Sequence, residues 1–167
     1  MQPEPWLRGP LEGVDPYLMP AAHALTHAGE DLARAVADVP GHALWTRPGG
    51  AASVGFHLRH IGGSIDRLLA YARGEALSDA QRAAGKAEEV PGAPEDGPAL
   101  LAAAQQAIAA ALAQIRATPR ETLLDPRGVG RARLPSTVLG LLFHVAEHTQ
   151  RHTGQLIATA RAVRDVR

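Results

Sequence analysis

Three histidines recur at intervals of four residues near the C-terminal end of the chain, at His144, His148 and His152. On an α-helix this spacing places side chains on one face, about one turn apart. Two imidazoles four residues apart can bind the same metal ion, as they do in zinc-binding helices with an H-E-x-x-H motif. The segment is therefore a candidate metal site.

A second pair of histidines, His57 and His60, lies in a distant part of the sequence. Together the two groups contain five of the eight histidines in the chain. The chain has no cysteine, so a transition-metal site must use nitrogen and oxygen ligands. For the same reason the protein has neither a disulfide nor a thiol nucleophile of its own.

The composition is that of an ordinary globular protein, with 46% hydrophobic and 20% charged residues. Its 17 basic and 17 acidic residues cancel, so we expect neither a nucleic acid nor a membrane as a partner. The N-terminus has no basic segment followed by an apolar run, and no apolar stretch reaches the length of a membrane span, residues 100–113 coming nearest. We therefore expect a cytoplasmic protein.

Apolar residues repeat at intervals of three and four in four segments, which predicts four helices. Stretches with proline and glycine separate these segments, which span residues 15–38, 53–73, 98–118 and 136–163. Asp15 and Pro16 are a favourable N-cap and first residue for the first helix. Ser53 can cap the second helix, and Gly74 can end it. We expect residues 1–167 to form one all-α domain, a four-helix bundle, in which metal sites are commonly built between facing helices.

Two long connections join these helices, at residues 41–52 and 74–97. Connections of this length often carry function or cover the mouth of a site, so substrate choice is expected to depend on them. Residues 125–135 predict a short hairpin.

Helical rotation places histidines beside the apolar stripe of two helices. In the last helix His148 and His152 lie roughly 40 to 80° from the centre of the stripe, and His144 lies about 120° away. In the second helix His57 borders the stripe, whereas His60 lies further round. Each of these two helices thus carries a histidine-bearing strip beside its apolar stripe. The two strips can meet across a cleft at the edge of the core, where their imidazoles could hold a divalent ion and leave coordination positions for water or substrate.

Three other histidines receive a different interpretation. His23 and His27 are also four residues apart, but they point away from the apolar stripe of their own helix. We interpret them as surface residues, and His42 lies in a connection.

Residues 146–155, Ala-Glu-His-Thr-Gln-Arg-His-Thr-Gly-Gln, resemble the helix-four motif H-x-x-x-H-x-G-Q of the DinB/YfiT superfamily. Residues 53–61 resemble the helix-two motif, and the opening Trp-Leu-Arg-Gly-Pro from Trp6 is also similar, so the resemblance covers residues 6–164. It implies a four-helix bundle with long loops, often a homodimer. It also implies one divalent metal ion, held by the triad His60, His148 and His152.

The resemblance implies roles for residues around this triad. Gly154 would allow close helix packing, and Gln155 would support the metal-binding site from outside the set of ligands. His57 and His144 are not in the triad, yet rotation brings His57 closer to the core than His60, so His57 stays an alternative or additional ligand. Three imidazoles favour Zn or Ni, with Fe, Mn and Cu as further candidates.

Superfamily members include thiol S-transferases that use bacillithiol, mycothiol or glutathione, a mycothiol-dependent isomerase and metal-dependent hydrolases. We therefore expect first a metal-dependent enzyme that activates a small-molecule thiol for attack on an electrophilic carbon. Candidates for holding the carboxylates of the thiol are Arg59, Arg67 and Arg151, although each also suits a solvated helix surface.

Two alternatives remain. Metal-assisted hydrolysis would be favoured by a carboxylate near the open position, but Glu147 lies roughly 100° around the helix from His148. The histidine-bearing strips contain no other acidic residue. The other alternative is a non-catalytic bundle with a structural metal, or a module that binds a small molecule.

Overall fold

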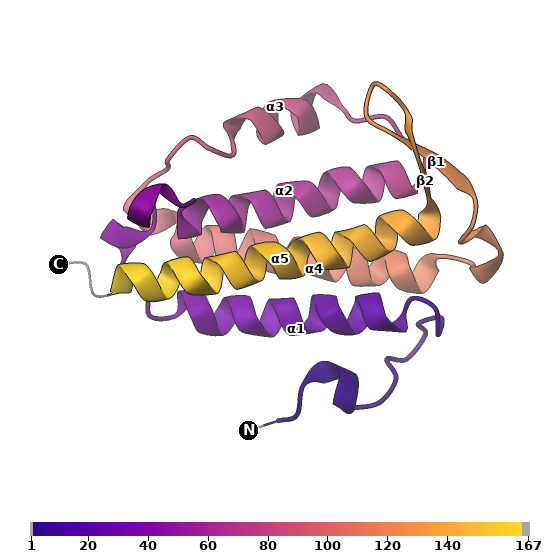
Figure 1. Cartoon of the computed structure of the whole chain (residues 1–167), viewed down its shortest axis with the longest axis horizontal. Coiled ribbons are helices and arrows are strands. Elements are labelled where there is room, and N and C mark those ends of the chain that lie inside the picture. Colours follow the sequence, from indigo (N-terminus) through magenta and orange to yellow (C-terminus); the bar gives the residue numbers. More distant parts are fainter. Residues whose placement is uncertain (1, 165–167) are drawn as a thin grey trace.

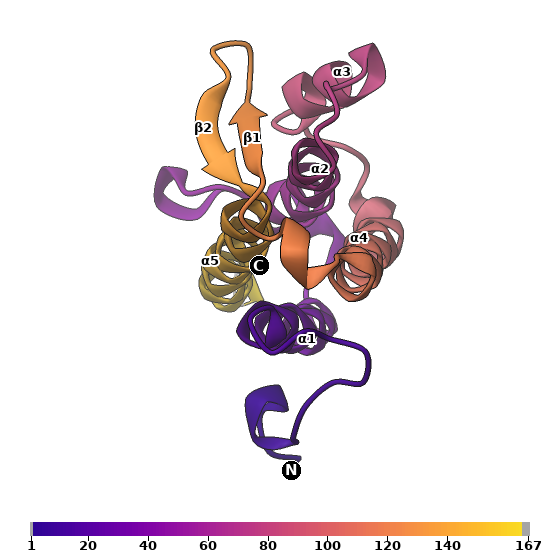
Figure 2. The same ribbon diagram turned by 90° about the vertical axis from the view of Figure 1, so that its right-hand side faces the viewer.

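The computed structural model describes residues 2–164 and is an all-α bundle with one small hairpin (Figure 1). This confirms the predicted fold class. Four long helices form the bundle, namely α1 (Met19–Val36), α2 (Val54–Ala72), α4 (Gly97–Ala117) and α5 (Val138–Arg164). Figure 2 looks along the bundle and shows that α4 and α5 lie on opposite sides, each in contact with both α1 and α2.

The two helices that carry the histidine motifs bury the faces that the periodicity predicts. Ser53 caps α2, because its hydroxyl accepts a hydrogen bond of 3.2 Å from the Phe56 amide. Gly74 ends the helix at φ +82°, and its amide donates to the Tyr71 carbonyl. The buried aliphatic residues of the two helices form the core with residues of α1 and α4, and they include Val54, Leu58, Ile61, Ile65, Val138, Leu142, Val145, Leu156, Ala160 and Val163.

The predicted start of α1 at Asp15 is wrong by four residues. The Asp15 carboxylate accepts a hydrogen bond from the Tyr17 amide at 2.8 Å, and the Leu18 amide donates to the Asp15 carbonyl at 2.9 Å. These bonds make residues 15–18 a turn, and the helix begins at Met19. Asp15 thus caps a turn and not the helix.

The connections contain more structure than their composition predicts. A fifth helix, α3 (Asp79–Ala87), lies within the 74–97 connection and begins with a capping box between Ser78 and Gln81. The predicted hairpin is present, with β1 (Pro126–Val129) antiparallel to β2 (Leu134–Thr137). Short 3₁₀ turns complete the connections, at Pro5–Leu7, Gly41–Ala43, Pro48–Gly50, Pro94–Asp96 and Arg120–Thr122.

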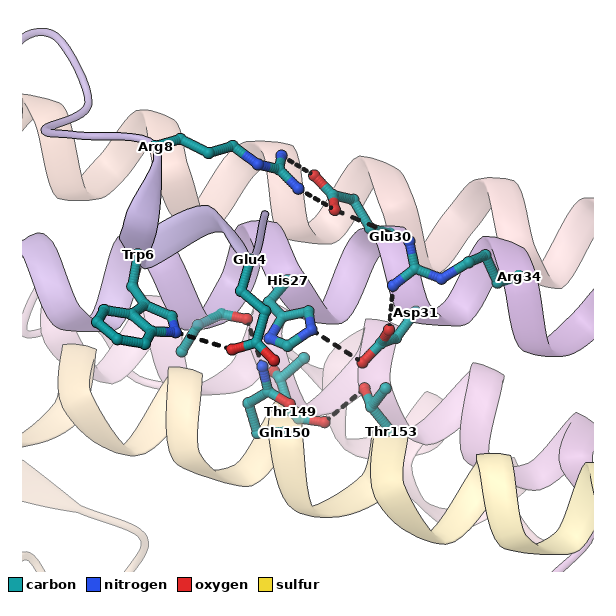
Figure 3. A network of polar contacts seen from close by, with 11 residues as sticks. Glu4, Trp6, Arg8, His27, Glu30, Asp31, Arg34, Thr149, Gln150 and Thr153 are labelled. Carbon is teal, nitrogen blue, oxygen red and sulfur yellow. Dashed lines mark hydrogen bonds and ion pairs between the residues drawn. The ribbon is translucent and has the colours of Figure 1, made fainter. Parts of the chain in front are cut away.

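The N-terminal segment folds back along α1, where an ion-pair network holds it (Figure 3). Arg8 donates two hydrogen bonds to Glu30, of 2.5 and 2.9 Å. In the same network His27 Nε2 lies 3.5 Å from the Asp31 carboxylate. His23 Nε2 lies 3.0 Å from the Gly9 carbonyl. His23 therefore contacts the N-terminal segment, whereas His27 pairs with a residue of α1 itself.

One helical segment in residues 2–164, Pro94–Ala117, is long and apolar enough to cross a membrane. The expectation that no apolar stretch reaches this length is therefore wrong. The helical segment extends beyond residues 100–113 in both directions. Its buried residues, among them Ile108 and Ile115, pack in the bundle core, and a core helix can meet the same criterion of length and composition.

Candidate metal centre

Helices α2 and α5 pack side by side and run in opposite directions, so the middle of one faces the middle of the other (Figure 1). This arrangement brings together three of the predicted residues. His60, His148 and His152 each offer a ring nitrogen, and these three atoms lie within 4.8 Å of one another. The three side chains are partly buried.

The spacing of these nitrogens is close to what one ion requires. His60 Nε2 lies 2.9 Å from His148 Nε2. Two imidazole nitrogens on one tetrahedral Zn²⁺ are about 3.3 Å apart, given metal–nitrogen bonds of about 2.05 Å. The ring of His152 completes the group, with its centroid 4.3 Å from that of His60 and 4.5 Å from that of His148.

His57 lies behind His152, away from the other two rings of the triad. Its side chain is 3% exposed, and its Nδ1 lies 3.1 Å from His152 Nδ1. That contact occupies Nδ1 of His152, and no hydrogen bond within residues 2–164 involves its Nε2. Helical rotation was therefore right that His57 is more buried than His60. The motif was right to group His60 with His148 and His152.

Glu88, which the sequence analysis did not consider, lies on the other side of His60. It follows α3 directly, is only 6% exposed, and its Oε2 is 2.7 Å from His60 Nδ1. Its Oε1 accepts a hydrogen bond of 2.6 Å from Arg67. The histidine-bearing strips of α2 and α5 still contain no further acidic residue, and Glu88 reaches His60 from the connection between α2 and α4. No periodicity signal marks it, because α3 buries none of its own residues.

The charge states follow from burial and from these contacts. Burial lowers the pKa of His57 and of His148 to about 4, and that of His152 to about 3, and the charge of neighbouring His60 adds to each shift. Burial alone would raise the pKa of Glu88, but its hydrogen bonds from His60 and Arg67 outweigh this effect and lower it. At neutral pH His57, His148 and His152 are therefore uncharged, and each has one ring nitrogen with a lone pair. Glu88 is ionised.

The Glu88 contact also orients the ring of His60. An ionised carboxylate can only accept a hydrogen bond, so His60 Nδ1 donates to Glu88, and the other ring nitrogen, Nε2, faces His148 Nε2. Such a carboxylate–histidine pair is the arrangement that commonly orients a metal ligand.

A divalent ion fits these residues. Three imidazoles with converging nitrogens are a donor set for Zn²⁺ or Ni²⁺, and at neutral pH the uncharged rings of His148 and His152 each offer a nitrogen lone pair to an ion.

The structure places the other predicted site residues at the edge of the centre or away from it. The ring of His144 is 5.4 Å from that of His148, but it is 46% exposed and its Nδ1 lies 3.2 Å from Glu147. Gln155 is exposed and its side chain makes no hydrogen bond within residues 2–164. The close packing implied for Gly154 is wrong, because a Cβ atom there would meet nothing within 4 Å in the described chain.

The three candidate arginines all bind groups of the protein. Arg67 pairs with Glu88, and Arg151 donates two hydrogen bonds to Glu147, of 3.0 and 2.8 Å. Arg59 lies over the Trp45 ring, 4.7 Å from its centroid, and donates to the Val90 carbonyl at 2.6 Å. Arg59 and Arg67 therefore hold the segment around α3.

A pocket of about 190 Å³ lies beside the histidines. Phe56 is a wall of this pocket, and its ring stacks on that of His60 with 5.3 Å between centroids and 11° between planes. The pocket is lined by Trp45, Arg47, Ala52, Ser53, Phe56, Glu89 and Pro91. It therefore combines aromatic walls with one basic and one acidic side chain.

The family model of the DinB superfamily matches residues 24–156, which include α2, α4 and the histidines of α5. The chain belongs to the DinB superfamily. No curated protein sequence matches it. As a DinB protein it has the helical bundle that the motifs implied, and its histidine triad is compatible with a divalent metal site.

Proposed function

We propose that this DinB protein is a divalent-metal-dependent enzyme that transfers a small-molecule thiol to an electrophilic carbon. The observation that carries the proposal is the cluster of three imidazoles whose nitrogens lie within 4.8 Å of one another, with His148 and His152 uncharged at neutral pH. His60, His148 and His152 would hold the ion, Zn²⁺ or Ni²⁺ in the first place. When bound, the ion would lower the pKa of a thiol and hold it as thiolate.

The protein supplies the remaining parts of the site from α2 and the connections. His57 and Glu88 hold the rings of His152 and His60, which directs one nitrogen of each ring toward the centre. The aromatic pocket between Trp45 and Phe56 would bind the electrophile beside the thiol. This chemistry requires no cysteine of the protein, and the chain has none.

Hydrolysis is the weaker candidate. A hydrolase would gain from a free carboxylate that accepts a proton from water. Glu88 lies at the centre, but both of its oxygens are bound, one to His60 and one to Arg67. Glu147 is held by Arg151 at the protein surface. Both carboxylates are therefore committed to ion pairs.

The test begins with the metal content of the purified protein. We expect near-stoichiometric divalent metal in the wild type and none in the double variant His148→Ala/His152→Ala. The control is His23→Ala/His27→Ala, which removes a histidine pair of the same spacing from α1. His23 contacts the Gly9 carbonyl and His27 contacts Asp31, so neither belongs to the metal centre. A wild type that neither contains metal nor binds added Zn²⁺ or Ni²⁺ would refute the proposal.

The second step measures transfer. Bacillithiol, mycothiol and glutathione are each mixed with the electrophile monochlorobimane, and product formation is followed with and without protein. In this reaction the sulfur–carbon bond forms as the carbon–chlorine bond breaks, and chloride and the thiol proton are released to solvent. We expect one thiol to react faster with the wild type and with the α1 control, but not with the α5 double variant. A metal-loaded protein that hydrolyses ester substrates and transfers no thiol would support the hydrolase instead. Light scattering on the same samples tests the homodimer that we also propose.

A further inference from the structure

We infer that Glu88 is a positioning residue for His60, and that it couples the α3 segment, residues 75–97, to occupancy of the metal centre. The inference rests on the metal centre proposed above. It extends that proposal because it assigns metal-dependent order to a segment outside the two helices that carry the ligands.

The first observation is the isolation of Glu88 from water. Its carboxylate is almost completely buried, yet it is ionised, and its two oxygens each have one partner on α2. Buried charges are retained when they are paired and hydrogen-bonded. The partners, His60 and Arg67, are seven residues apart and so lie on the same face of α2. Glu88 therefore fixes a ring that belongs to the candidate metal site.

The second observation is how the α3 segment is attached to the bundle. Helix α3 itself buries no residue, so apolar packing contributes little to holding it. Its attachment consists of polar contacts with α2 and the preceding connection. Besides the Glu88 pairs, Arg59 donates to the Ala87 and Val90 carbonyls, Gln81 donates to Asp66, and Trp45 donates to the Ala93 carbonyl.

These two observations define a thermodynamic link. If docking of the segment orients His60 for an ion, then an ion on His60 must favour docking by the same free energy. In Glu88→Gln a single uncharged amide oxygen remains as acceptor for both His60 and Arg67, so the contact that orients the His60 ring and its Nδ1 proton would weaken. The predicted consequence is weaker metal binding and a segment whose order no longer depends on the ion.

The test compares Glu88→Gln with Glu95→Gln. The two substitutions make the same change in charge within the α3 segment, but Glu95 is exposed. Zn²⁺ affinity is measured by competition with a chromogenic chelator. Outer partners of metal ligands typically contribute a factor of about 10 to 100 in affinity, so we expect that loss for Glu88→Gln and wild-type affinity for Glu95→Gln.

Amide hydrogen exchange of the metal-free and Zn²⁺-loaded proteins provides the second readout. In the wild type we expect slower exchange over residues 79–93 when Zn²⁺ is bound. In Glu88→Gln saturated with Zn²⁺ that difference should disappear. Unchanged Zn²⁺ affinity of Glu88→Gln would overturn the inference, as would exchange that does not respond to Zn²⁺ in the wild type. A wild type that binds no Zn²⁺ would refute the proposed function and this inference together.

Discussion

Two adjacent glycines of α2, Gly62 and Gly63, provide a matched test of the Glu88 contacts. Both are partly buried in the middle of the helix. In a helix interior, alanine is more favourable than glycine by about 0.5 to 1 kcal/mol. With no other effect, either substitution by alanine would stabilise the protein by about that amount, which predicts a rise in melting temperature of roughly 1 to 4 °C.

The surroundings of the two positions separate their outcomes. A Cβ atom on Gly62 would have its nearest neighbour, the Ala103 carbonyl oxygen, at 3.8 Å, which is ordinary van der Waals contact. A Cβ atom on Gly63 would lie closer than 3.0 Å to Glu88 Oε1 and 2.9 Å from the Arg67 guanidinium. The Glu88 carboxylate would therefore have to move away from its partners.

The magnitude follows from the bonds at risk. Hydrogen bonds to charged groups contribute about 1.5 to 3 kcal/mol each, and Glu88 accepts two. Loss of one of them outweighs the gain in helix propensity, so we expect Gly63→Ala to destabilise the protein by about 1 to 2 kcal/mol. Gly62→Ala should stabilise it.

Urea denaturation followed by circular dichroism, in buffer with EDTA, measures both variants without a contribution from bound metal. A Gly63→Ala protein as stable as Gly62→Ala would refute the reasoning, because the Glu88 ion pair would then contribute nothing to the fold.

Four further predictions concern the helices that carry the site. Ser53→Ala removes the cap of α2 and should cost about 0.5 to 2 kcal/mol in urea denaturation. Leu142→Ala leaves a cavity in the core and should cost about 2 to 5 kcal/mol in the same assay. Burial lowers the pKa of His57 and His148 to about 4, and that of His152 to about 3, so below pH 6.5 the unfolded chain binds protons that the folded chain does not. At pH 5.5 each of these three histidines should therefore lower the free energy of unfolding of the metal-free protein by about 1 kcal/mol, after a reduction for solvent screening. Equal melting temperatures at pH 5.5 and pH 7.5 would contradict this prediction. Removal of metal with EDTA should leave the far-ultraviolet spectrum helical and the melt cooperative, because the apolar core holds the bundle, and a non-cooperative melt would indicate a structural metal instead.

The sequence by itself determined the four long helices and the histidines that face one another. Periodicity is a local property, so the buried positions of α2 and α5, from Leu58 to Leu156, follow from spacing alone. Rotation around α2 also ranked His57 as more buried than His60. The grouping of His60 with His148 and His152 came from the motif, because rotation on one helix does not reveal which ring nitrogens converge with those of another.

Only the tertiary structure decided what surrounds those histidines. Glu88 is separated from His60 by 28 residues and lies in a connection without apolar periodicity, so nothing local indicates that its carboxylate meets that ring. The same applies to His57, whose Nδ1 contact with His152 depends on the register between two antiparallel helices. Side-chain contacts between distant segments are set by how the core packs. The ligands of this DinB protein could thus be proposed from its sequence, whereas the groups that orient them required the fold.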